Sequence, residues 1–254
     1  MDWGELEKKQ KDIWEAIDYR FSELVKKYGS VVYCKKKDLK KPVYDGCLNV
    51  RKYAEARIHV MWILKEHNDQ PASLDNGHLA VFADCLGEVD DADVIRFKGN
   101  VSSFRSLRLI ERASRVLLNL PEGDSTEAFK SVAIVELGKC SGENQTPNSR
   151  LDDLVKWWGD ILKRQVVAYQ PDVIIVPGCH FNWIKELLEW NNNKGVSRKA
   201  GKAKAELYYT TKNLPIITIP HPSWYQGGCT EDDWMKALLR AFKKAMPHVQ
   251  LGRT

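Results

Sequence analysis

The chain has 254 residues, of which 43% are hydrophobic and 29% charged, and it contains nine tryptophans. This composition favours a folded globular protein with a buried core, built as one large α/β domain or as two small ones. The formal net charge of +5 is compatible with a polyanionic partner but is too small to indicate one. No apolar run approaches the roughly 20 residues of a membrane helix, which excludes a membrane partner and predicts a soluble protein.

The six cysteines are scattered along the sequence. They form no Cys-x-x-Cys pair and no Cys/His group with zinc-finger spacing, so no metal site and no cofactor are expected. Because the sequence shows no apolar leader at its amino terminus, we expect a cytoplasmic, intracellular protein with free thiols.

The first elements along the chain are a helix, a basic arm and a strand. Apolar side chains at helical spacing predict an amphipathic helix over residues 3–28. The lysine-rich residues 31–41 favour an extended arm, and residues 52–56 favour a short helix. The nearly continuous apolar run at 59–64 is typical of a strand covered on both faces, and a polar loop at 65–71 follows it.

Helices and strands alternate along the rest of the chain. The predicted helices cover residues 101–120, 151–168, 181–190 and 234–245. The predicted strands cover residues 132–137, 171–176 and 216–219. A polar, basic insert at 191–204 precedes the last strand. The alternation predicts an α/β fold, with a central, mainly parallel four-stranded sheet flanked by helices and with an N-terminal helical extension.

One histidine stands at the end of the last predicted strand, in the run Pro220-His221-Pro222-Ser223. The two prolines stiffen the backbone and prevent a helix from starting there. The imidazole is therefore expected on a rigid loop at the carboxyl end of a strand, where open α/β sheets bind ligands. An ordinary turn with a solvated histidine is the alternative.

Three strand-loop motifs occur in a fixed order. They are Lys139-Cys140 with Asn144-Gln-Thr-Pro147 after one strand, Pro171–Gly178 as a strand and turn, and His221-Pro222-Ser223. In this order they resemble the uracil-DNA glycosylase superfamily, nearest to its thermophile-type branch but without its iron-sulfur cysteines. The resemblance implies a glycosylase-like domain at 58–254. Residues 1–57 have no counterpart and are expected to form a helix and a basic arm packed on that domain.

The resemblance implies a DNA glycosylase that flips a damaged or deaminated base out of the stack and hydrolyses its N-glycosidic bond. The catalytic residues would be Glu66, which orients water, and His221, which donates a hydrogen bond to the departing base. An ion pair of Glu66 with Lys65 or Lys139, without a role in the chemistry, is the alternative.

The implied base-binding residues are Asn68, Glu136 and Asn144. Glu136 stands where the family has an asparagine, and an ionised carboxylate cannot donate a hydrogen bond to uracil O4. An unpaired acceptor in a dry pocket costs about 1–3 kcal/mol, so the identity of the base stays open. A shifted alignment with Glu136 facing solvent is the alternative.

The implied DNA contacts lie in two segments. Ser223 would contact a phosphate or the backbone, and Trp224 and Tyr225 would wedge into or stack on the DNA, unless these two aromatics fill the core. Lys199 and Lys202 of the basic insert would follow the phosphate backbone, unless the insert is a disordered, solvated loop.

Two other interpretations remain open beside a glycosylase acting on damaged or single-stranded DNA. The first is a nucleic-acid-binding module on the same fold that has lost catalysis, which the altered first loop and Glu136 favour. The second is an α/β hydrolase of small nucleosides that uses Glu66 and His221. The sequence does not indicate the oligomeric state.

Overall fold

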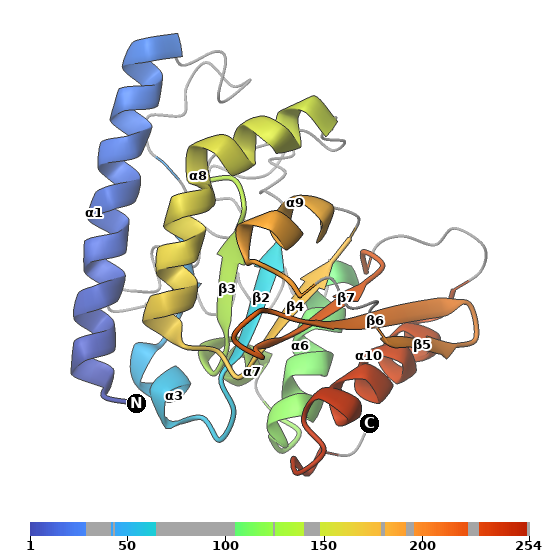
Figure 1. Cartoon of the computed structure of the whole chain (residues 1–254). Helices are drawn as coiled ribbons and strands as arrows, with labels where there is room; N and C mark the ends of the chain where they lie inside the picture. Colours follow the sequence, from blue (N-terminus) through green and yellow to red (C-terminus); the bar gives the residue numbers. More distant parts are fainter. Residues whose placement is uncertain are drawn as a thin grey trace.

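The computed structural model describes residues 1–28, 42, 44–64, 105–123, 125–139, 148–178, 181–191, 196–222 and 229–252. The helices are α1 (Trp3–Tyr28), α3 (Val50–Glu55), α6 (Arg105–Leu118), α7 (Ser125–Lys130), α8 (Asn148–Tyr169), α9 (Phe181–Leu187) and α10 (Glu231–Ala245). The strands are β1 (Gly46–Cys47), β2 (Val60–Leu64), β3 (Ala133–Glu136), β4 (Val173–Pro177), β5 (Val196–Ala200), β6 (Ala203–Tyr209) and β7 (Pro215–Ile219). Figure 1 shows how these elements are arranged.

The strands form one mixed sheet of seven strands in the order β1-β3-β2-β4-β7-β6-β5. Its centre, β3-β2-β4-β7, is parallel throughout. Strand β1 pairs antiparallel with β3 at one edge, and the antiparallel β5–β6 hairpin extends the sheet beyond β7. The α/β class is therefore confirmed, whereas the prediction of a four-stranded, mainly parallel sheet is wrong.

Two of the three additional strands have sequences that carry little strand signal. Strand β1 is only two residues long. Strand β5 and the first two residues of β6 lie in the segment interpreted as a polar insert (191–204), where lysines dominate the pattern. The rest of β6, residues 205–209, has the alternating burial and the tyrosines that are typical of a strand, although no strand was predicted there.

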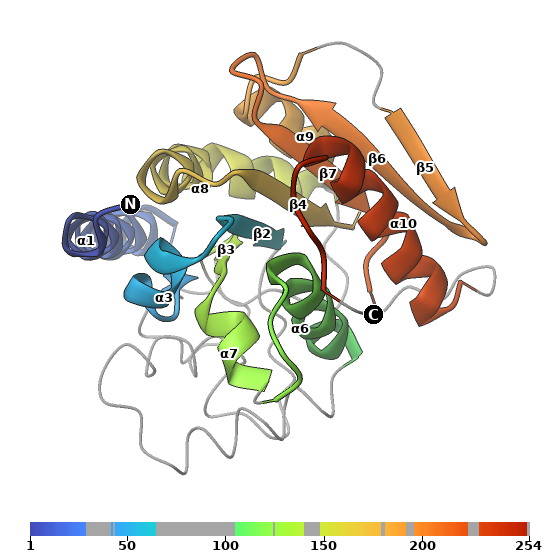
Figure 2. The same ribbon diagram turned by 90° about the horizontal axis from the view of Figure 1, so that it is seen from below.

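Two layers of helices cover the sheet (Figure 2). Helices α6, α7 and α10 pack on one face around Trp62, and α1, α3, α8 and α9 contribute to the core on the other face around Trp158. Both tryptophans are fully buried. The central strands are buried on both faces, which explains why their sequences are continuous apolar runs.

The amino-terminal segment contributes to the same core and the same sheet. Helix α1 buries Leu6, Ile13 and Ile17 beside α8, and β1 pairs with β3. The predicted helix over residues 3–28 is thereby confirmed. The proposed division of the chain between residues 57 and 58 stays a prediction.

The order of the central strands reverses the direction of winding at β2. The chain passes from β2 through α6 and α7 to β3 on one side of β2, and from β3 through α8 to β4 on the other side. These two crossovers use opposite faces of the sheet (Figure 2). In open α/β sheets, ligands typically bind outside the carboxyl ends of the two strands at such a reversal, here β2 and β4.

Among the described helices, none combines the length and apolar character that crossing a bilayer requires.

Replacing Ile17 by Ala should lower the free energy of unfolding by about 2–5 kcal/mol, because a fully buried side chain leaves a cavity beside α8. Tyr19, on the same helix, is 68% exposed, so replacing it should change the free energy of unfolding by less than about 0.5 kcal/mol. Urea unfolding followed by tryptophan fluorescence measures both. Equal effects of the two substitutions would show that α1 does not pack on the domain as described.

Candidate functional site

The carboxyl end of β7 presents His221 on a fixed backbone. The indole Nε1 of Trp234 on α10 donates a hydrogen bond to the carbonyl oxygen of Pro220 at 2.7 Å. The backbone N–H of Gly178, just after β4, donates to the carbonyl oxygen of Ile219 at 2.7 Å. Both bonds hold residues directly before His221, whose side chain is exposed, while the following Pro222 is buried.

Gly178 occupies a backbone position that other residues rarely adopt. Its φ of 109° lies in the region that favours glycine. The turn after β4 can therefore bring its amide to the end of β7. The predicted Pro171–Gly178 strand and turn thus forms, and it adjoins the histidine loop.

The ends of the four parallel strands form one row. The register pairs Glu136 with Leu64 and Pro177 with Ile219, so the chain leaves β3, β2, β4 and β7 at the same edge. The segments after these ends are those in which the sequence placed its candidate catalytic residues. This edge is the candidate site.

Glu136 lies in this row but not beside His221. It is 2% exposed, so the alternative of a solvent-facing side chain is wrong. By strand alternation it shares the face of Ile134, which α6, α7 and α10 cover. Its backbone is three strand spacings from that of Ile219, about 14 Å, so the structure does not bring Glu136 and His221 together. A role of Glu136 in base binding stays a prediction.

Of the other predicted site residues, Lys199 and Lys202 are exposed, on β5 and in the turn after it. Six more lie outside the described residues, and their roles stay predictions. They are Glu66, Asn68, Asn144, Ser223, Trp224 and Tyr225. In the described part of the chain, no group of three or more His, Cys, Asp or Glu side chains is placed to hold a metal ion.

A buried ion pair, which the sequence did not predict, lies beneath the end of β3. The Lys139 ammonium contacts the Asp45 carboxylate at 2.5 Å, and neither side chain is exposed to solvent. Lys139 also donates to the carbonyl oxygen of Glu136 at 2.5 Å and to Gln165 Oε1 at 3.0 Å. The Gln165 amide donates to Asp45 at 2.6 Å, so each charged group has several partners.

This network joins three parts of the chain. Asp45 precedes β1, Lys139 follows β3, and Gln165 lies on α8. Trp14 of α1 donates its indole N–H to the carbonyl oxygen of Asp45 at 3.0 Å. The local sequence around Lys139 does not indicate that this lysine is buried or which residue it pairs with, because Asp45 is 94 residues away in the chain. The network therefore stabilises the fold, and within it the Lys139 ammonium is paired with the Asp45 carboxylate.

A thiol near the network is not a nucleophile. Cys47 is 1% exposed, and its burial raises the pKa of the thiol well above its ordinary value. The thiol therefore stays protonated and unreactive at neutral pH.

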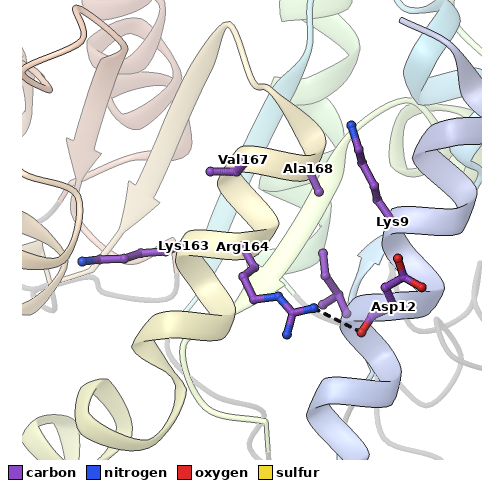
Figure 3. Close-up of a pocket in the computed structure, with 7 residues that line it drawn as sticks. Lys9, Asp12, Lys163, Arg164, Val167 and Ala168 are labelled. Atoms are coloured by element: carbon purple, nitrogen blue, oxygen red, sulfur yellow. Dashed lines mark hydrogen bonds between the residues drawn. The ribbon is translucent and has the colours of Figure 1, made fainter.

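A cavity of about 330 Å³ lies elsewhere, between α1 and α8 (Figure 3). Val167 and Ala168 form part of its apolar wall, and Lys9 and Arg164 bring positive charge. The Arg164 guanidinium donates to the backbone carbonyl oxygen of Asp12 at 3.4 Å. None of the candidate site residues is among those that line this cavity, and its lining contains no histidine to act as a donor to a departing base.

Comparison with known proteins yields little similarity. No family model and no curated protein matches the chain. One solved structure that it resembles is a domain of unknown function, DUF1537, from Bordetella bronchiseptica, with bound citrate and as a domain-swapped dimer. The sequence identity is 14% and the TM-score 0.33, over 81% of this chain and 44% of that chain. The chain thus spans less than half of that protein, and a likeness of this size carries no inference.

The assignment to the uracil-DNA glycosylase superfamily is wrong, since the comparisons give no match to that family and only this weak structural neighbour. Its motifs are short. Many parallel α/β sheets contain an apolar strand that is followed by a Pro-Gly or a His-Pro turn. Such motifs therefore do not specify one family.

Replacing Asp45 by Asn should lower the free energy of unfolding by about 3–5 kcal/mol, because the buried Lys139 ammonium loses its counter-charge. The exposed pair of Arg51 and Glu55 on α3 provides the control. Glu55→Gln should leave the urea midpoint unchanged, because a solvated ion pair contributes little. Equal midpoints for the wild type and the Asp45 variant would contradict the buried pair.

Proposed function

We propose that the chain hydrolyses the N-glycosidic bond of a damaged or deaminated base in DNA. The observation that supports this most is the exposed His221, which follows a fixed backbone at the carboxyl edge of the sheet, on the strand next to β4. An imidazole held on a rigid backbone reaches a bound ligand without first having to be ordered.

Hydrolysis of an N-glycosidic bond requires a hydrogen-bond donor at the departing base, and a histidine can supply one. When the bond from the sugar to the base breaks, negative charge develops on the departing base. A pre-positioned N–H donor stabilises that charge more in the transition state than in the ground state. In this proposal His221 is the donor, and Glu66, which directly follows Lys65 after β2, orients the attacking water.

A second candidate is a nucleic-acid-binding module without catalysis, and the position of Glu136 favours it. This carboxylate is buried on the helix-covered face, about three strand spacings from the β7 end, roughly 14 Å. A base bound against His221 would not reach it directly. In this second proposal the edge binds a nucleic acid strand and leaves its bonds intact.

The test is a panel of single-stranded and duplex oligonucleotides carrying uracil, hypoxanthine, xanthine or an alkylated base, treated with alkali after incubation. The wild type should convert at least one of them into an alkali-cleaved product. Removing one donor to the developing charge should lower the rate of the His221→Ala variant by about 10²–10³-fold.

His248 provides a matched control because it is an exposed histidine that follows the last residue of α10, whereas the first turn of α10 lies at the candidate site through Trp234. The His248→Ala variant should cleave at the rate of the wild type. Intact strands together with salt-dependent binding would support the module without catalysis. A protein that neither cleaves nor binds any of the oligonucleotides would contradict both candidates.

A further inference from the structure

The β5–β6 hairpin exposes a basic face that no described helix covers. Ala200, Ala203 and Ala205 belong to the core cluster to which α10 also contributes, and Figure 2 shows α10 lying along the hairpin. The alternate residues Lys199 and Lys204 therefore point to the opposite side, where both are exposed. We call Lys199, Lys204 and the exposed Lys202 of the turn the hairpin face.

Two like charges lie directly opposite each other on this face. The register of the hairpin pairs Lys199 with Lys204. Side chains at such positions have their Cβ atoms about 5 Å apart, and like charges there destabilise the sheet. The ion pair of Lys204 with Glu206 offsets part of this repulsion, and an anion bound between the two ammonium groups would remove the rest.

The carboxylates of the described part leave this charge largely uncompensated. Lys204 contacts Glu206 at 2.6 Å, but neither Lys199 nor Lys202 forms an ion pair with any described residue. The acidic first turn of α10 is close, because a Cβ on Gly201 would lie 2.2 Å from Asp233. Asp233, however, is engaged in the capping box of α10.

The other two acidic residues of that turn are also engaged. Glu231 contacts Arg108 of α6 at 2.8 Å, and Asp232 contacts Arg112 of α6 at 3.5 Å. The acidic turn of α10 therefore pairs with α6 and its own helix end, and within the described part of the chain Lys199 and Lys202 keep no carboxylate partner.

The hairpin face adjoins the candidate site. Strands β6 and β7 are antiparallel, with Glu206 opposite Thr218 and Leu207 opposite Ile217. The antiparallel pairing puts the start of β6, and with it the turn that bears Lys202, at the carboxyl end of β7, which His221 follows. A strand bound along the hairpin face thus reaches the edge of the sheet that carries the histidine.

We propose that the hairpin face binds the phosphate backbone of a single-stranded nucleic acid and leads it to His221. This inference rests on the proposed function and adds the strand-binding surface to it. Three ammonium groups on one exposed face suit the regularly spaced charges of a polyphosphate backbone. A membrane surface fits less well, because the face bears no large exposed apolar side chain to insert.

The test compares three variants in binding a fluorescent, single-stranded oligonucleotide over a range of salt concentrations. Replacing all three lysines by Gln should weaken binding at least about tenfold and reduce the slope of log K against log salt by about 2. Replacing Lys8, Lys26 and Lys27 by Gln removes the same charge from exposed positions of α1 and should leave both quantities unchanged.

A charge reversal separates binding from folding. Lys199→Glu places opposite charges at the paired positions, so it should weaken binding while the melting temperature stays at or above that of the wild type. Equal losses in the α1 variant, or equally tight binding to anionic phospholipid vesicles, would overturn the inference.

Cleavage and binding distinguish this inference from the proposed function. If the wild type cleaves no substrate but the hairpin variants lose binding, the binding surface stands and the glycosidic activity fails. If the wild type cleaves and the hairpin variants bind and cleave as it does, the activity stands and the inference fails.

Discussion

The rest of the structure depends on the position of β2 in the middle of the parallel sheet. Strands β3 and β4 both pair with β2, one on each side, so the crossovers that reach them run on opposite faces. This arrangement requires a strand that is apolar on both faces, and Val60–Leu64 supplies it. It also places the reversal of winding at the carboxyl ends of β2 and β4, the edge at which open α/β sheets typically bind ligands.

Two further sets of contacts hold this edge in place. The pair of Lys139 and Asp45 joins the end of β3 to the segment before β1. A buried ion pair adds little net stability against an apolar replacement, but it penalises every arrangement that separates the charges. At the other end of the row, Trp234 and Gly178 fix the backbone before His221. Contacts that involve α1 at one end of the row and α10 at the other thus fix the carboxyl edge of the sheet.

Much of the fold could be predicted from local pattern. The apolar runs at 59–64, 171–176 and 216–219 indicate buried parallel strands, and helical periodicity indicates α1. Strand β6 could have been predicted from its alternating pattern and its tyrosines, whereas β5 could not, because Ser197, Arg198 and Lys199 outweigh its apolar ends. The pairing of Lys139 with Asp45 is a contact between residues 94 positions apart, which no local pattern encodes.

The family assignment failed because short turn motifs recur in parallel sheets whether or not the proteins share an ancestor.

The central claim is that a nucleic acid strand binds at the carboxyl edge with its base against His221. The most direct test is to follow the imidazole resonances of all histidines by NMR while a single-stranded oligonucleotide is added. The account predicts that the His221 ring resonances shift in a saturable manner, while those of His248, beyond α10, stay unchanged. Binding that shifts His248 but leaves His221 unaffected would contradict it.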